Sequence, residues 1–192
     1  MYKTIDEVEG LYKIIQFNDF RKTPGVTFNM MPHEIISRAD SLDRVIHQHN
    51  AVSPWPIGDV KRPWYMHLYQ DDNLAVLFGT REVDIYTPAH GKIEHFTVTS
   101  NDVYKNGELI AQGGAMLVWP KGDFHRIVSG EEGSASINLA IHYDGWDVKN
   151  NFNIYDVDLE SGKYKVIREG FKDQDSEDSG VKKEIYGTWF RK

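Results

Sequence analysis

Hydrophobic and polar residues alternate in short runs over residues 64–143. Turn-forming pairs such as Asn106-Gly107 and Lys121-Gly122 separate these runs of β-forming residues. Short strands at this spacing are typical of an antiparallel sandwich or barrel. The pattern therefore predicts strands over residues 65–69, 74–78, 83–87, 93–99, 116–119, 125–129 and 136–142.

The segment before this region follows a different pattern. Apolar residues within 33–48 recur near helical spacing, which predicts a helix in that stretch. Prolines at positions 54, 56 and 63 then disfavour a helix and predict a rigid, extended connector. We therefore interpret residues 1–57 as an N-terminal arm and connector that precede the main domain.

Beyond residue 143 the β-forming pattern continues and then ends. Residues 153–159 and 163–168 predict another strand pair, with Ser161-Gly162 in the turn. A polar run over 172–183 predicts a solvated linker, and residues 184–191 regain β-forming side chains that could form an edge strand. We therefore place a barrel domain over 58–170, and a polar linker with a C-terminal segment over 171–192.

Composition and charge narrow the class of protein. The chain has 192 residues, which suits one domain, and a net charge of −7. Lys and Arg never cluster beyond a pair, so we expect no nucleic-acid binding, and the anionic surface disfavours acidic membranes. The absence of cysteine excludes disulfides and thiolate metal ligands. Without a signal peptide or a long apolar run, we expect a soluble, cytoplasmic protein.

The stretch from Gly114 to Ser129 places turn and strand residues at informative gaps. Gly114 lets the chain turn into a strand, Pro120 ends that strand, and Gly122 permits the hairpin. His125 then lies on the returning strand, where it shares a face with Ser129. The stretch resembles the second motif of the cupin superfamily, in which Gly, Pro, Gly, His and Asn follow at these same gaps. Only Ser129, in place of the Asn, departs from it.

The first cupin motif is matched only in part further upstream. That motif carries two His, a Glu and a Gly at fixed gaps. Counting back from Gly79 puts Asp72 at the Glu position, His67 at the second His position and Tyr65 at the first. A second register takes His67 and Tyr69 as the two His positions, but it leaves no carboxylate at the Glu position. We therefore prefer the first register.

The resemblance implies an all-β, cupin-type jelly-roll barrel (a double-stranded β-helix) with a partly helical N-terminal arm and a C-terminal strand extension. Complete cupin sites hold a divalent metal such as Fe, Mn, Ni or Zn through His and Glu side chains. The matching ligands here are His67, Asp72 and His125, with Tyr65 in place of one His. The resemblance thus implies a metal-dependent enzyme, such as a dioxygenase or other oxygenase, an isomerase or a lyase, acting on a small organic molecule.

Two other functions fit the same residues. Some cupins isomerise or epimerise sugars without a metal, and the deoxysugar-nucleotide epimerases of the rhamnose pathway use a His as base and a Tyr as acid. His67 with Tyr65 or Tyr69 would supply such a catalytic pair. The chain lacks the many Arg and Lys that would bind a nucleotide diphosphate. The third function is a ligand-binding or sensor cupin without turnover.

Further residues are expected along the wall of a small-molecule pocket. Tyr69 shares the predicted face of His67, and Asn138 and His142 form the polar face of the strand after the second motif. Alternatively, Asp72 is a plain turn residue and His142 faces solvent. Cupins often use their terminal extensions for dimer contacts, so the resemblance also implies a homodimer.

Overall fold

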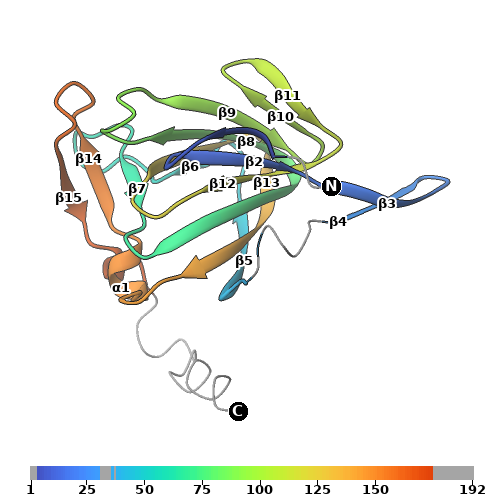
Figure 1. Cartoon of the computed structure of the whole chain (residues 1–192). Coiled ribbons are helices and arrows are strands. Elements are labelled where there is room, and N and C mark those ends of the chain that lie inside the picture. The colour runs from blue at the N-terminus through green and yellow to red at the C-terminus, as the bar shows by residue number, and fades with distance from the viewer. Residues whose placement is uncertain (1–3, 31–35, 37, 175–192) are drawn as a thin grey trace, which may run out of the picture.

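The computed structural model describes residues 4–30, 36 and 38–174, and nearly all regular structure in them is β. Thirteen strands form one antiparallel sheet that curls into a barrel, while β3 (Asn18–Thr23) and β4 (Val26–Met30) form a separate hairpin. Figure 1 shows this hairpin extending away from the barrel. The predicted all-β jelly-roll barrel is confirmed.

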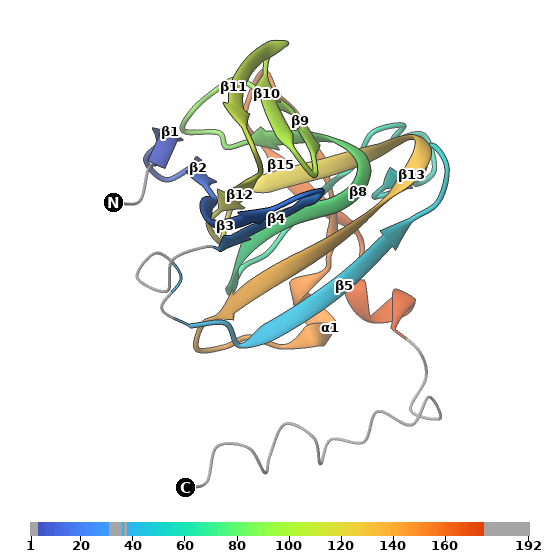
Figure 2. The same ribbon diagram turned by 90° about the vertical axis from the view of Figure 1, so that its right-hand side faces the viewer.

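Two long strands, β8 (Gln70–Tyr86) and β13 (Phe124–His142), form the frame of the barrel. They pair with each other in antiparallel fashion over nearly their whole length. The first part of β8 also pairs with β12 (Ala115–Trp119), and its second part pairs with β9 (Glu94–Thr99). Each long strand therefore runs through both layers of the barrel (Figure 2).

Three shorter strands border the other side of β13. Its first residues pair with β7 (Trp64–Met66) and then with β6 (Val52–Ser53), and its last part pairs with β5 (Ser41–His47). The remaining strands extend these layers: β1 (Thr4–Val8), β2 (Tyr12–Gln16), β10 (Asp102–Lys105), β11 (Glu108–Gln112), β14 (Ile154–Val157) and β15 (Tyr164–Arg168). Two short helical turns, α1 (Val148–Asn151) and η1 (Gly170–Asp173), follow β13 and β15.

Alternation along the strands decides which side chains fill the barrel. On β8, Leu74 and Val76 point inward, and after a bulge at Leu77 so do Val83 and Ile85. These residues share one core with buried side chains of other elements, which are Leu11, Tyr12, Ile14, Phe96, Val98, Val103, Ala111, Ala115, Leu117 and Trp119. Burial of these apolar surfaces is the main force that closes the two layers on each other.

Several strand boundaries differ from those predicted. The strands predicted over 74–78 and 83–87 are one strand, because Gly79 (φ +68°) bends β8 without ending its pairing. Likewise, residues 125–129 and 136–142 both belong to β13, which bends at Gly130–Gly133. The strand predicted over 65–69 already ends at Met66.

The helix predicted within 33–48 is wrong for its second half, since residues 41–47 form β5. Exposed and half-buried positions alternate there, and pairing with β13 outweighs the helical spacing of the apolar residues. Residues 1–57, interpreted as an arm, also supply β1, β2 and β6 to the barrel sheet. The C-terminal strand expected at 184–191 lies outside the described residues. No helix within the described ranges is long and apolar enough to cross a membrane.

We expect Gly79→Ala to destabilise the fold far more than Gly91→Ala. Both glycines have positive φ, which costs a residue with a Cβ about 1–2 kcal/mol. A Cβ at Gly79 would lie 2.0 Å from the carbonyl oxygen of Gly133, whereas at Gly91 nothing lies within 4 Å. The free energy of unfolding, measured with urea, should fall by about 3–5 kcal/mol for Gly79→Ala and by about 1 kcal/mol for Gly91→Ala. Equal losses of unfolding free energy in the two variants would contradict the close contact between Gly79 and Gly133.

Candidate functional site

His67 lies inside the barrel just after β7, where the chain turns into β8, and is 5% exposed. Its Nδ1 is 2.5 Å from the carbonyl oxygen of Asn151 in α1, and its Nε2 is 3.2 Å from Oδ2 of Asp72. The backbone is also held, because the amide of Gly122 donates a hydrogen bond to the carbonyl of His67. Oxygen atoms therefore engage both ring nitrogens.

Asp72, the third residue of β8, faces the same space and is 3% exposed. Its Oδ1 accepts hydrogen bonds from Nε2 of Gln70 at 2.8 Å and from Nδ2 of Asn138 at 2.6 Å. With His67 on Oδ2, the carboxylate has partners from β8, from β13 and from the segment after β7. These partners offset much of the cost of burying its negative charge.

His125, the second residue of β13, completes the group that we term the His67 cluster: His67, Asp72 and His125. Its ring centroid is 4.8 Å from that of His67 and 5.0 Å from that of Trp119. Its Nδ1 lies 3.4 Å from the carbonyl oxygen of Asp123, which is a weak contact. Ligand atoms of the three side chains lie within 4.8 Å of one another. The structure thus brings together the three residues predicted as metal ligands.

The electrostatic surroundings shift the pKa values of the two imidazoles, His67 and His125, in opposite directions. Burial disfavours the charged form of His67, but the carboxylate of Asp72 and the Asn151 carbonyl outweigh it, so the pKa of His67 is raised. Burial and the nearby positive charge of His67 lower the pKa of His125 to about 3. Burial opposes the ionisation of Asp72, yet the neighbouring histidines hold its pKa well below the usual value.

The same donor set also fits a divalent metal. If Nδ1 of His67 carries the proton and donates a hydrogen bond to the carbonyl oxygen of Asn151, the lone pair of Nε2 faces the carboxylate of Asp72. Two imidazole nitrogens and one carboxylate oxygen suit Fe, Mn, Ni or Zn. A bound ion would supply the positive charge that a protonated His67 supplies otherwise.

Tyr65, the residue predicted as an acid, lies beside the cluster on β7. Its ring centroid is 6.5 Å from that of His67 and 6.0 Å from that of His125. Burial raises the pKa of its hydroxyl, which is therefore protonated at neutral pH. Tyr65 is half-buried, whereas His67 and His125 beside it are buried.

The three residues predicted for the pocket wall lie in different places. Asn138 donates to Asp72 and so contacts the His67 cluster directly. His142 is half-buried at the end of β13, where its ring stacks on Trp146 with centroids 4.0 Å apart. Tyr69 is 38% exposed and lies beyond the end of β7. The pocket roles of Tyr69 and His142 stay predictions.

Residues outside both motifs hold the cluster in place. Nδ2 of Asn151 donates to Oε1 of Gln70 at 2.9 Å, and Gln70 in turn donates to Asp72. Phe152 packs edge-on against His67, with ring centroids 5.0 Å apart. The sequence contains one sign of this support, a polar Gln70 two residues before Asp72 on the same strand face. No motif marks Asn151 or Phe152.

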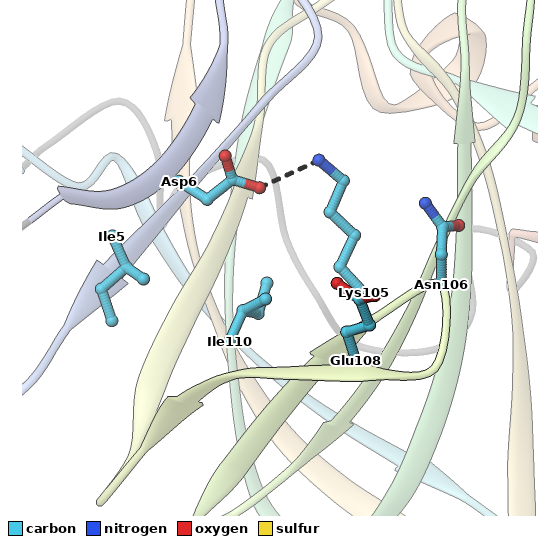
Figure 3. A pocket seen from close by; sticks show the side chains of 6 residues that line it. All are labelled: Ile5, Asp6, Lys105, Asn106, Glu108 and Ile110. Atoms are coloured by element: carbon cyan, nitrogen blue, oxygen red, sulfur yellow. Dashed lines mark hydrogen bonds and ion pairs between the residues drawn. The ribbon is translucent and has the colours of Figure 1, made fainter.

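Two surface pockets lie away from the His67 cluster. One, of about 550 Å³, lies between β1 and the β10–β11 hairpin, and Nζ of Lys105 is 3.0 Å from Oδ2 of Asp6 beside it (Figure 3). The other, of about 470 Å³, lies beneath the β1–β2 turn, next to Asp71 and Val118. Neither is lined by a predicted site residue. We therefore place the candidate site at the His67 cluster.

No family model matches the chain, and no curated protein matches it in sequence. Solved structures match it in fold. NovW, a 4-keto-6-deoxy sugar epimerase from the novobiocin biosynthetic gene cluster of Streptomyces spheroides, has a TM-score of 0.53 and 13% identity, over 76% of this chain and 71% of NovW.

Two further structures show the same likeness. A dTDP-4-dehydrorhamnose 3,5-epimerase from Bacillus anthracis, with TDP and PPi bound, has a TM-score of 0.56 and 10% identity, over 74% of this chain and 79% of the epimerase. ChmJ, a 3'-monoepimerase from Streptomyces bikiniensis in complex with dTDP-quinovose, has a TM-score of 0.52 and 9% identity, over 72% of this chain and 67% of ChmJ.

Likeness at these identities concerns the fold alone. The described strands and these structures agree on a jelly-roll barrel, the architecture that the stretch from Gly114 to Ser129 predicts. The chain therefore has the cupin-type jelly-roll fold that these sugar epimerases share.

Proposed function

We propose that the protein is an isomerase or epimerase that moves protons on a small, sugar-like carbonyl compound inside the barrel, without a metal. One observation carries the proposal. His67 is held between two oxygen acceptors beside a second imidazole, His125, which has one weak partner among the described residues. Two imidazoles in opposite protonation states provide a positive charge and a base beside each other, and Tyr65 next to them can provide the acid.

The two oxygen contacts of His67 indicate the charge of its ring. Nδ1 of His67 is hydrogen-bonded to a carbonyl oxygen, which only accepts, and Nε2 lies 3.2 Å from a carboxylate oxygen in an ion pair, so we infer that the ring is an imidazolium. The ring of His125 contacts a carbonyl oxygen through Nδ1, and no hydrogen-bond partner of its Nε2 is found in the part of the chain that the structure describes. A neutral His125 therefore has a nitrogen free to accept a proton, and the negative charge of a forming enolate would raise the low pKa that burial and His67 give this imidazole.

These protonation states assign roles in a reaction next to a carbonyl group. His125 takes a proton from the carbon, and the C–H electron pair moves to form an enolate. The positive charge of the His67 imidazolium stabilises the enolate through space, because both of its N–H groups face other oxygens. Tyr65 returns a proton to the carbon, and transfer of a proton from His125 to the tyrosinate through solvent restores both side chains, so no electron donor or acceptor is needed. Sequence reasoning made His67 the base; we reassign that role because Asp72 and Asn151 engage both of its nitrogens.

The comparisons support this reaction over a metal-dependent one. The structures that resemble the chain include several sugar epimerases, and two of these contain TDP or dTDP-quinovose. Because their likeness to this chain is one of fold, the proposed substrate is limited to a sugar-like carbonyl compound.

A metal-dependent oxygenase, isomerase or lyase is the second candidate. The observation that favours it is the convergence of the two imidazoles and the carboxylate of the His67 cluster. A divalent ion bound there would act as a Lewis acid on a substrate oxygen. Tyr65 would keep its place beside the cluster and its role as a proton donor.

We also infer that the protein is a homodimer held by the β3–β4 hairpin. The hairpin exposes Phe20 (58%) and Phe28, and an isolated two-stranded hairpin is marginally stable in water. A second apolar surface lies on the outer side of the barrel, with exposed Leu42, Ile46, Leu77 and Phe78. In a two-fold dimer the hairpin of each copy can cover the apolar surface of the other.

Incorporation of deuterium from D2O tests the proposed reaction. With a 4-keto-6-deoxy sugar, free or as its dTDP derivative, mass spectrometry should show deuterium entering next to the carbonyl. His125→Asn removes the base and should slow the exchange by about 10²–10⁴-fold. His95→Asn, at an exposed His on β9, is the matched control and should exchange like wild type. Absence of exchange with both sugars would exclude this substrate class.

Chelation separates the two candidate reactions. Exchange that continues at the same rate after treatment with EDTA is the expected result for proton transfer by side chains alone. Exchange that is lost after chelation and restored by one divalent ion would contradict the metal-free reaction and support the second candidate.

The ion pair of His67 and Asp72 should make stability depend on pH. The pKa of His67 is higher in the folded protein than the value of about 6.5 in the unfolded chain, so protonated His67 stabilises the fold. This stabilisation is complete below about pH 6.5 and is lost as the pH rises through the pKa of the folded protein. The lowered pKa of Asp72 stabilises the fold above about pH 4 and loses effect on acidification. Wild type should therefore exceed Asp72→Asn in free energy of unfolding most between about pH 4 and 6.5, and less at about pH 9. Urea titrations showing a constant difference would contradict the ion pair.

Replacing Phe20 and Phe28 together by Ser should convert a dimer into a monomer, because the hairpin loses its apolar contacts. Size-exclusion chromatography with light scattering measures the change. Phe171→Ser, at an exposed Phe in η1 outside both apolar surfaces, is the control and should stay dimeric. A monomeric wild-type protein would rule the homodimer out.

A further inference from the structure

Arg81 is a buried cation inside the barrel, at the end opposite the His67 cluster. It lies on β8 just after the bend of that strand, is 2% exposed, and points inward as Val83 does. Its Nε donates to Oγ of Ser134 at 3.0 Å, and its Nη2 donates to the carbonyl oxygen of Val45 at 3.1 Å. Among residues 4–30, 36 and 38–174, no carboxylate forms an ion pair with it.

The missing counter-ion distinguishes Arg81 from arginines on the outside of the barrel. Arg62 and Arg126 both pair with the carboxylate of Asp84. Burial lowers the pKa of Arg81 to about 10, so its side chain stays charged at neutral pH. A buried charge is costly unless it is paired. An anionic ligand that enters the barrel would supply the pairing.

The serine hydroxyl that accepts from Arg81 belongs to a group of polar side chains. Oγ of Ser134 is 2.7 Å from Oγ of Ser129, which is 3.0 Å from Nδ1 of His47. Oγ of Ser136, at the next inward position of β13, is buried without a hydrogen-bond partner in the described chain. We term these five residues the Arg81 cluster. A hydroxyl without a partner can donate a hydrogen bond to an oxyanion.

Polar side chains connect the Arg81 cluster with the His67 cluster. Ser134, Ser136 and Asn138 occupy successive inward positions of β13, and Asn138 donates to Asp72. His47, on the neighbouring strand β5, contacts Ser129 and is only half-buried, so the Arg81 cluster reaches solvent at this side chain. Four residues of β-strand span about 13 Å. Side chains from both clusters point into the space between them and shorten this distance. A sugar that carries one charged group can therefore contact both clusters.

We propose that the Arg81 cluster binds an oxyanion of the substrate, a carboxylate or a phosphate, so that the substrate is an acidic sugar derivative. The guanidinium supplies the charge and a planar set of N–H donors, and the serine hydroxyls supply further donors. The identity of the remaining ligand rests on the proposed function. Binding of the oxyanion does not depend on turnover.

Isothermal titration with small compounds tests the Arg81 cluster without turnover. Wild-type protein should bind glucuronate, glucose 6-phosphate or inorganic phosphate, and should not bind glucose. Arg81→Met should weaken binding by at least about ten-fold, or 1.4 kcal/mol, and Ser136→Ala should weaken it by a smaller factor. Arg62→Met, at a surface arginine, is the matched control and should bind like wild type. Preference for glucuronate identifies a carboxylate site, and preference for the phosphates identifies a phosphate site.

Two results would overturn the oxyanion site: wild-type protein that binds none of the three anions, or Arg81→Met that binds them as wild type does. If Arg81→Met does not fold, Arg81→Lys and Ser136→Ala take its place, since Lys lacks the planar donor set. Unchanged affinity in both would overturn the site as well. Binding without deuterium exchange on acidic keto sugars counts against the proposed reaction alone, whereas exchange that Arg81→Met leaves unchanged counts against the oxyanion site alone.

Discussion

The antiparallel pairing of β8 with β13 is the interaction on which the rest of the structure depends. Both strands pass through the two layers of the barrel, so one register sets the positions of all strands beside them. The same register places Arg81 opposite Ser129 and His125 opposite Ile85. Two polar clusters at opposite ends of one barrel are therefore fixed by a single set of backbone hydrogen bonds. A slip by one residue would turn the cluster residues of the slipped strand to the outer face.

Charge balance determines what the His67 cluster can do. Two imidazoles and a carboxylate, all nearly closed to water, require at least one positive charge among them, because the buried Asp72 is ionised. A proton on His67 meets this requirement, and so would a divalent ion. Metal-free proton transfer and metal-assisted chemistry are thus alternative ways of balancing one arrangement of side chains. The carbonyl of Asn151 is compatible with both, since it accepts from Nδ1 whether Nε2 carries a proton or binds an ion.

Much of the barrel could be predicted because its turns and strands are marked by residues close together in the sequence. Gly114 and Gly122 have positive φ, as the turn and hairpin at the second motif require. Motif gaps also located Asp72 and His67, although Asp replaces the Glu of complete cupin sites. The helix predicted within residues 33–48 is wrong for residues 41–47, which form a strand. Three apolar residues in so short a stretch can match the period of a helix or that of a strand, so their spacing does not distinguish the two.

The contacts that complete the candidate site could not be predicted from the sequence. Asn151 reaches His67 through a backbone carbonyl, which any residue type provides, so its identity gave no signal. Arg81 appears in the sequence as an ordinary polar residue near a turn. Only the bulge at Leu77 turns it inward, and a bulge leaves no reliable mark on a single sequence.

The bond between Asn151 and His67 joins residues 84 positions apart. During synthesis from the N-terminus, the chain can complete every strand up to β13 before the ribosome releases α1. The imidazole reaches its final orientation only after that turn docks at the end of the barrel. The orientation of His67 that the proposed reaction requires is thus acquired late in folding. It is also the first property to disappear when α1 opens locally, even while the barrel itself stays intact.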